Sequence, residues 1–382
     1  MNTGPAFDLA PLLGVLVAGA LLAAGPLLWW RTRRRDARPG TGLRALALMT
    51  LFLSFDLVLF GAFTRLSDSG LGCPDWPGCY GQASPIGARV PIASAEAAIP
   101  TGAVTSTKAW IEMAHRYGAT AIGALIVALA LLALRAQRRG VAGIASRWAW
   151  LTLIWVCLQG AFGALTVTMR LYPAIVTLHL LGGLGLLALL AVQAESYRPR
   201  PMPLSPGLRT AVLIVTALVV LQIALGGWVS SNYAVLACRD VPTCQGAWWP
   251  DMDLAAGFAV RRPLGTGGDG AFLPFAALTA IHMVHRLGAV VVIAAIALLA
   301  WRLRAHDGAA GRFALPLAAL LAWQAASGLG NVLLGWPLVA AVGHTAGAAG
   351  LVVVLTVLIV RSAPERSARR LASVTGTPGL AS

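Results

Sequence analysis

Charged side chains are scarce in this sequence, and acidic ones most of all. Only 11% of its 382 residues are Asp, Glu, Lys or Arg, and just 14 of these are acidic, whereas an ordinary soluble domain has roughly 25% charged residues. A folded chain in water needs a polar surface, so the shortage argues against a cytosolic enzyme, a disordered chain and a nucleic-acid-binding module. With 58% hydrophobic residues, the composition predicts an integral membrane protein, all-α because a helix satisfies its own backbone in lipid.

Nine apolar runs are long enough, at about 20 residues, to cross a bilayer as helices. They lie near residues 9–30, 43–64, 110–134, 148–169, 172–194, 210–230, 277–301, 313–335 and 338–360. The first run lies near the N-terminus, where a signal peptide would also lie. A basic cluster follows it rather than precedes it, however, which favours an anchor helix with its N-terminus outside.

Basic residues are concentrated in alternate connections between the runs. These connections hold Arg31 to Arg44, Arg135 to Arg147, Arg198 to Arg209, Arg302 to Arg312 and Arg361 to Arg370. The positive-inside rule places this side, and the C-terminus, in the cytoplasm of a multi-pass protein of the inner or plasma membrane. The net charge of +15 is thus explained by topology, without a nucleic-acid partner.

The chain contains an internal repeat. Most landmarks recur at an interval of 165 residues, and the text AHRYGA at 114–119 returns 170 residues later as VHRLGA at 284–289, which implies a second loop longer by five residues. The recurring pairs are Cys73 with Cys238, Cys79 with Cys244, Gly61 with Gly226, Gln159 with Gln324, and His179 with His344. Such self-similarity predicts two tandem pseudo-symmetric four-helix transmembrane bundles, eight core helices in all, behind one N-terminal anchor helix.

The expected organisation follows from these patterns. It comprises an anchor and basic cytoplasmic linker (1–42), a first four-helix half (43–195), a cytoplasmic linker (196–209), a second half (210–361) and a cytoplasmic tail (362–382). Each half has one long loop on the outer face, between its first and second helices.

Five of the six histidines lie in apolar runs, where a polar side chain is costly and usually functional. His115 and His179 occupy the second and fourth helices of the first half, and His285 and His344 the same helices of the second. Two imidazoles at one depth can bind a heme iron from opposite faces, so one bis-His heme site is expected in each half. Hydrogen bonding between helices is the simpler alternative, and zinc is disfavoured because no third or fourth ligand lies at that depth.

Glycines follow the last histidine of each half and offer room for a flat macrocycle, although close helix packing explains them equally well. They are Gly182, Gly183, Gly185, Gly347 and Gly350.

Glu112 distinguishes the two halves. It lies three residues before His115, on the same helix face, whereas the matching position of the second half is His282. A buried carboxylate beside one heme only predicts acid/base or redox chemistry there and a redox cofactor in the other half. A solvated position at the membrane edge is the alternative for Glu112. His282 is open between polar packing, propionate contact and ligation, and Asp56 is a lower-ranked intramembrane acid.

Three arginines are candidates for binding heme propionates, which a guanidinium pairs in bidentate fashion. Arg116 and Arg286 directly follow their histidines, and Arg65 lies at the outer end of its run. Snorkelling to the membrane surface is the alternative for each of them.

Two C-x₅-C pairs lie in the outer loops, Cys73 with Cys79 and Cys238 with Cys244. An extracytoplasmic position favours a local disulfide in each loop, with a redox-active dithiol or a loop staple as alternatives. Cys157 lies within an apolar run and is expected to pack inertly.

The motifs together resemble the heme A synthase family. They are TRLSDSGLGCPDWPGC at 64–79, EMAHR at 112–116, HLLGG at 179–183, HRLG at 285–288 and GHTAG at 343–347. The resemblance covers roughly 43–360 and implies oxidation of the C8 methyl group of heme O to a formyl group, giving heme A for terminal oxidases. It further implies substrate heme between His115 and His179, catalysis involving Glu112, and heme B between His285 and His344.

The resemblance makes heme O, heme A and the lipid bilayer the expected partners, with heme O synthase and oxidase assembly factors conceivable by function. Two alternatives stay open at this point: a bis-His di-heme electron carrier of the cytochrome b or b561 kind, and a heme transporter or chaperone. The sequence leaves the oligomeric state open, a homo-oligomer included.

Overall fold

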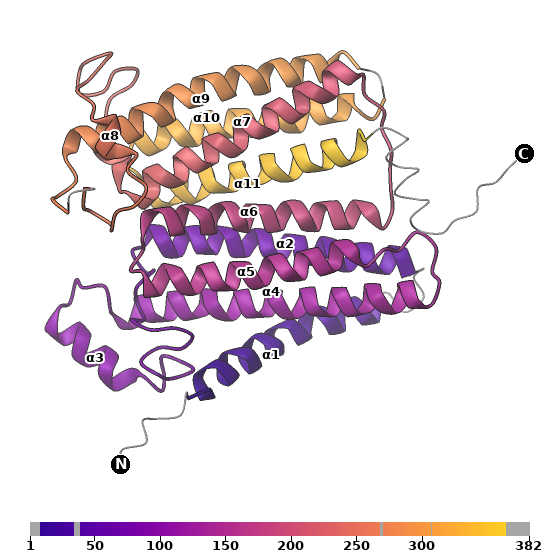
Figure 1. Cartoon of the computed structure of the whole chain (residues 1–382), viewed down its shortest axis with the longest axis horizontal. Helices are drawn as coiled ribbons and strands as arrows, with labels where there is room; N and C mark the ends of the chain where they lie inside the picture. Colours follow the sequence, from indigo (N-terminus) through magenta and orange to yellow (C-terminus); the bar gives the residue numbers. More distant parts are fainter. Residues whose placement is uncertain (1–7, 34–38, 268–269, 307, 364–382) are drawn as a thin grey trace, which may run out of the picture.

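The structure, a computed structural model, describes residues 8–33, 39–267, 270–306 and 308–363 (Figure 1). Within these residues, nine helices are long and apolar enough to cross a membrane. They are α1 (Ala10–Arg33), α2 (Pro39–Leu66), α4 (Ser106–Arg138), α5 (Arg147–Thr168), α6 (Pro173–Ser196), α7 (Pro206–Ser231), α9 (Phe275–Arg304), α10 (Ala314–Leu333) and α11 (Leu338–Arg361). The prediction of an all-α integral membrane protein is confirmed, and each span ends within about one helical turn of its predicted limit.

The helices after α1 contact one another in two groups of four. In the first group, α2 and α5 each pack against both α4 and α6, and in the second, α7 and α10 each pack against both α9 and α11. The groups meet where α6 packs against α7 and α11, and where α2 packs against α11 (Figure 1). Helices α6 and α11 begin and end 165 residues apart, which is the interval of the internal repeat in the sequence.

Helix α1 lies outside these groups and packs along α4 (Figure 1). Its buried residues are Pro11, Val15, Gly19 and Ala23, a spacing of four that forms one narrow stripe of a helix. A Cβ built at Gly19 would lie 2.5 Å from Thr120 of α4. Close approach of the two backbones therefore requires the glycine, as is usual between membrane helices.

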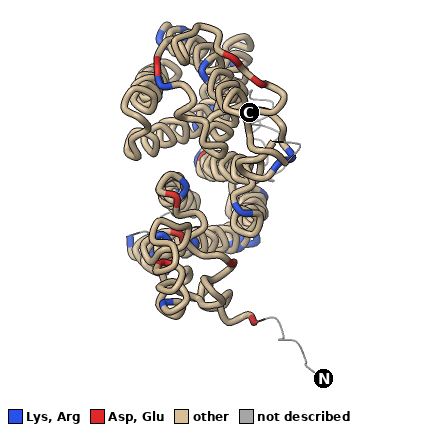
Figure 2. The backbone as a smooth tube through the Cα atoms, turned by 90° about the vertical axis from the view of Figure 1, so that its left-hand side faces the viewer, with Lys and Arg blue, Asp and Glu red and all other residues tan. Residues whose placement is uncertain are grey.

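The two ends of the molecule differ in character, and we name them the loop end and the basic end. The loop end carries the connections at 67–105 and 232–274, which contain α3 (Arg89–Ala98), the 3₁₀ helix η1 (Ala234–Ala237) and the short α8 (Leu254–Gly257). Seen from this end, the transmembrane helices are viewed nearly along their axes (Figure 2). The basic end carries the Arg-rich connections and the 3₁₀ helix η2 (Gly311–Phe313). The sequence patterns predicted none of these four short elements.

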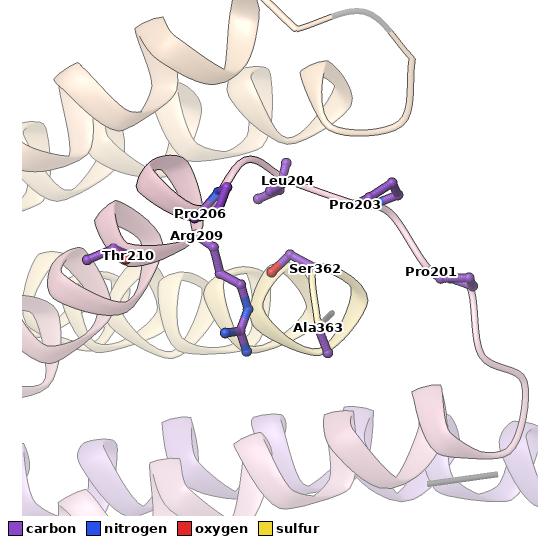
Figure 3. A pocket seen from close by; sticks show the side chains of 8 residues that line it. All are labelled: Pro201, Pro203, Leu204, Pro206, Arg209, Thr210, Ser362 and Ala363. Carbon is purple, nitrogen blue, oxygen red and sulfur yellow. The ribbon is translucent and has the colours of Figure 1, made fainter. Parts of the chain in front are cut away.

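An ion cluster joins the two groups of helices at the basic end. Glu195 of α6 is buried and accepts hydrogen bonds from Arg361 of α11, both at 2.9 Å, and from Arg44 of α2 at 3.2 Å. A hollow nearby separates the start of α7 from the end of α11 (Figure 3). Because Arg209 and Ser362, which line it, are at the basic end, this hollow is distinct from the histidine sites. The predicted tail beyond residue 363 and the linker residues 34–38 lie outside the described residues.

Candidate functional site

The four predicted ligand histidines form two pairs toward the loop end. His115 lies on α4 and His179 on α6, two helices that both pack against α2 and α5, and His285 on α9 and His344 on α11 both lie on helices packed against α7 and α10. The intervals from Pro173 to His179 and from Leu338 to His344 are equal. Each group of four helices thus contributes one pair, at matching positions.

Each of the four imidazoles faces a glycine on a neighbouring helix. A Cβ built at Gly61 would lie 2.9 Å from Nε2 of His115, and one at Gly226 would lie 3.0 Å from Cε1 of His285. The same construction at Gly163 and Gly328 gives 3.5 Å to His179 and 3.3 Å to His344. Side chains at Gly61 and Gly226 would therefore crowd the rings, so these glycines keep space free beside them.

The glycines that follow the histidines serve a different purpose. A Cβ at Gly182 would meet the side chain of Gln159 at 2.6 Å, and one at Gly347 would meet Trp323 at 2.7 Å. Gly185 and Gly350 likewise approach side chains of α5 and α10. These contacts favour close helix packing over the alternative of a macrocycle lying on the glycines.

The donor set fits a heme better than a tetrahedral metal ion. Among the residues described, no group of three or more His, Cys, Asp or Glu side chains is placed to hold a metal, whereas zinc needs three or four protein ligands. A heme iron receives four nitrogens from its macrocycle and needs only two axial ligands from the protein. The buried Nδ1 of His179 has no hydrogen-bond partner in the described part of the chain, so this ring is not in place to bridge helices.

Glu112 lies beneath the first disulfide loop rather than at a solvated membrane edge. Its side chain is only 5% exposed. Its Oε2 accepts a hydrogen bond from the backbone N–H of Cys73 at 2.7 Å, and its Oε1 accepts one from Arg116 at 2.5 Å. A carboxylate with these partners is buried, compensated and fixed in position, as an acid/base group must be.

Arg116 and Arg286 hold the two disulfide loops in the same way. Arg116 donates to the backbone carbonyls of Asp75, Pro77 and Gly78. Arg286 donates to the carbonyls of Asp240, Thr243 and Cys238 at 2.8, 2.9 and 3.0 Å. In the structure both guanidinium groups therefore contact the loops. Their contact with heme propionates stays a prediction.

Both loops contain the predicted disulfides, Cys73–Cys79 and Cys238–Cys244. Asp75 caps the first loop by accepting from the N–H groups of Tyr80 and Gly81. Asp240 caps the second through Gln245 and Gly246. Hydrogen bonds from the Thr243 hydroxyl and from these backbone N–H groups lower the pKa of Asp240 to about 2.

The remaining candidates lie at other places. His282 is buried, with Nδ1 3.0 Å from the carbonyl of Ala234 in η1. Arg65 reaches the second group of helices, donating to the Ser230 carbonyl at 2.9 Å and lying 4.1 Å from the Tyr233 ring. Asp56 is exposed on α2. Cys157 is exposed on the membrane-spanning helix α5, and the expectation that it is inert stays a prediction.

Sequence reasoning missed three polar residues that the structure places in these sites. Gln222 and Ser327 lie beside His285 and His344, and Arg262 is buried in the second loop, where it donates to Asn232 at 2.6 Å. Gln222 was detectable in the repeat, because the matching residue in the first half is the apolar Leu57.

These features define a multi-pass membrane protein with one histidine pair per half and a disulfide-closed loop above each pair. Comparison with known proteins agrees with this class. Residues 44–356 match the model of the COX15-CtaA family, described as cytochrome oxidase assembly protein, and the chain belongs to this family.

Curated relatives span nearly the same length. Heme A synthase of Shewanella oneidensis is 36% identical over 314 residues, covering 81% of this chain and 93% of the relative. Heme A synthase of Methylorubrum extorquens (strain PA1) is 31% identical over 374 residues, covering 90% and 91%. Heme A synthase of Halalkalibacterium halodurans is 27% identical over 318 residues, covering 79% and 91%.

Proposed function

We propose that this protein is a heme A synthase, which oxidises the C8 methyl group of heme O to a formyl group and so supplies heme A to terminal oxidases. The observation that carries the proposal is the difference between the two halves at one helix position. Glu112 is a buried, hydrogen-bonded carboxylate three residues before His115, and the matching residue before His285 is His282. The first half therefore has a buried carboxylate at this position, and the second half has an imidazole.

The first half would bind the substrate. His115 and His179 approach from α4 and α6, and the absence of a side chain at Gly61 leaves room for the His115 ring. Held between two axial ligands, heme O would present its edge at a fixed height in the bundle. We assign these residues to the substrate iron.

The second half would hold heme B between His285 and His344, with His282, Arg286 and Arg65 as further candidates for contact with a heme. Heme B, when bound, supplies one-electron redox chemistry. The glycines facing these histidines, Gly226 and Gly328, let the two imidazole rings lie close to α7 and α10. Arg116 completes the set of candidate contacts in the first half.

Glu112 would move protons during the reaction. Conversion of a methyl group to a formyl group with oxygen from water releases four electrons and four protons, through a hydroxymethyl group and a dihydroxymethyl group, which is the hydrate of the aldehyde. The four electrons would pass through the second half to an external one-electron acceptor. The last step, loss of water from the hydrate, is redox-neutral and needs a group that takes one proton and returns another. The Glu112 carboxylate, held by Arg116 and the N–H of Cys73, is suited to this role.

The proposal also covers the orientation of the protein in the membrane and the division of the chain into two halves. The Arg-rich basic end would face the cytoplasm by the positive-inside rule, and the disulfide loops would lie on the oxidising outer face. Each half (43–195 and 210–361) would act as one heme-binding unit. Heme O synthase and oxidase assembly factors are the partners that this function implies.

The proposal is tested by heme extraction. The full chain is expressed with a heme O synthase in a host that makes no heme A, and acid-extracted hemes are separated by HPLC. Appearance of heme A or its hydroxylated precursor is expected. Unconverted heme O, in a host where a known synthase converts it, would overturn the proposal and favour a di-heme electron carrier.

A further inference from the structure

The hollow at the basic end is bounded by the linker between the two halves, the first turns of α7 and the end of α11 (Figure 3). Its volume is about 370 Å³, within the range of small-ligand sites. The backbone N–H of Met202 donates to the Arg361 carbonyl at 2.7 Å and holds the linker against α11. Leucine and proline side chains line one part of the hollow, and its polar groups come from Arg209, Thr210 and Ser362. None of the described residues that line it is acidic.

Arg209 has no partner for its charge in the described part of the chain. Its Nε is buried and makes no hydrogen bond, and none of the ion pairs among the described residues includes it. Glu195, the buried carboxylate of the basic end, is already shared by Arg361 and Arg44. The Arg209 side chain instead extends from α7 toward Ser362 (Figure 3). Because a buried donor without an acceptor costs free energy, this position favours an added acceptor.

The place of Arg209 in its helix favours an anion as that acceptor. Helix α7 begins at Pro206, with Ser205 as its N-cap, so Arg209 lies at the start of the helix. The helix dipole disfavours a cation there and favours an anion, yet the first turn of α7 has no acidic residue. An anion in the hollow would therefore be attracted both by the guanidinium and by the positive end of the dipole.

The exposed face of α7 indicates that the anion belongs to a lipid. Large hydrophobic side chains are exposed along this helix from the hollow onward, namely Leu213, Ile214, Val220 and Leu221. They follow Thr210 at helical intervals of three and four, so they continue the helix face that lines the hollow. An acyl chain would lie along this face while its phosphate lies in the hollow, whereas a free phosphate would use the hollow alone. Basic pockets between membrane helices commonly bind anionic headgroups.

We propose that the hollow between α7 and α11 is a binding site for the phosphate of an anionic phospholipid, held by the Arg209 guanidinium and the start of α7, with an acyl chain along Leu213 and Ile214. The tail at 364–382 is a poorer occupant, because it has three arginines and only one glutamate. The lipid would join the first helix of the second half to its last helix. The site is remote from the histidine pairs and does not depend on the proposed function.

The test is native mass spectrometry of the full chain, released from a nonionic detergent and titrated with phosphatidylglycerol. The parent should bind a first phosphatidylglycerol saturably, and more tightly than phosphatidylcholine, whose headgroup has no net charge. Arg209→Gln should weaken this binding by about 10-fold or more, as expected for a lost charged hydrogen bond, and Arg209→Lys should weaken it less. Arg304→Gln is the matched control, because it removes the same charge from an exposed position at the end of α9, and its binding should stay at the parental level.

A second variant and a melting curve separate loss of the site from loss of the fold. Thr210→Glu places a negative charge at an exposed position in the hollow and should weaken phosphatidylglycerol binding at least as much as Arg209→Gln. Without lipid, Arg209→Gln should melt at or above the parental temperature, because it removes a charge that has no partner. Added phosphatidylglycerol should raise the melting temperature of the parent and of Arg304→Gln, and should raise that of Arg209→Gln less.

Inorganic phosphate distinguishes the two sources of the anion. At millimolar concentration it should neither displace phosphatidylglycerol nor raise the melting temperature, because it lacks the acyl chain. If it binds in an Arg209-dependent manner and phosphatidylglycerol binds no more tightly, the site takes free phosphate and the lipid assignment is overturned. Equal binding of phosphatidylglycerol by the parent, Arg209→Gln and Thr210→Glu would overturn the site itself.

Discussion

Removal of Arg116 should open the first disulfide loop far more than removal of Arg286 opens the second. Both arginines donate to three loop carbonyls, but only Arg116 also compensates a buried carboxylate, Glu112. Arg116→Ala leaves that charge unpaired, which typically costs about 3–5 kcal/mol. Arg286→Ala loses charge-assisted hydrogen bonds worth about 1.5–3 kcal/mol. The difference, about 2 kcal/mol, corresponds to roughly a 30-fold difference in the population of the open loop.

Site-resolved proteolysis measures this difference. Arg89 in the first loop and Arg239 in the second are both exposed, so trypsin cleavage after each reports opening of its own loop. Cleavage tracks the open population when the loop recloses faster than it is cut. Arg116→Ala should accelerate cleavage at Arg89 about 10- to 30-fold more than Arg286→Ala accelerates cleavage at Arg239.

A double variant identifies the cause. Glu112→Gln in the Arg116→Ala background removes the unpaired charge and retains an oxygen for the N–H of Cys73, so cleavage should fall back by about tenfold. Equal acceleration in both loops, or no recovery in the double variant, would refute the argument from buried charge.

Three further predictions concern packing, the ion cluster and pH. Gly226→Ala should lower the bound heme B measured by pyridine hemochrome, because its Cβ would lie 3.0 Å from His285. Gly207→Ala should retain the heme, because a Cβ there would have no atom within 4 Å. Equal heme content in the two variants would show that crowding of His285 does not matter. Glu195→Gln, which breaks two buried ion pairs, should lower the apparent melting temperature in detergent, whereas Asp68→Asn in a solvated pair with Lys108 should change stability by less than about 1 kcal/mol. The pKa of Asp240 is lowered to about 2, so the stability that its carboxylate gives the second loop is complete above the ordinary carboxyl pKa and is lost as pH falls from about 4 toward 2. Pepsin should therefore cut the second loop faster across that pH range in the parent protein. A similar rise in Asp240→Asn would assign the effect to other groups.

The nine spans and the two disulfides were predictable because each depends on a local pattern. A helix such as α6 is specified by an uninterrupted apolar run, and Cys73 and Cys79 are close in sequence as well as in space. The internal repeat then placed His115, His179, His285 and His344 on matching helices without any knowledge of tertiary contacts.

The partners of the buried polar groups were not predictable in this way. Arg116 donates to carbonyls about 40 residues earlier in the chain, and backbone carbonyls carry no sequence signature. The loop helix α3 has only a short amphipathic pattern. The contacts of Gln222 and Ser327 with the histidines depend on helix rotation, which the hydropathy of a run does not determine.

The central claim is that Glu112 performs chemistry in the half that binds the substrate. The most direct measurement is the heme content of purified Glu112→Gln, co-expressed with a heme O synthase in a host without heme A, and compared with Glu96→Gln. Glu96 is a suitable control because it is an acidic residue of α3, in the connection just before α4, and accepts from the Ser106 N–H at an exposed site. We expect bound heme B and heme O with little or no heme A in Glu112→Gln, and heme A at the parental level in Glu96→Gln. Heme A at the parental level in Glu112→Gln would contradict it.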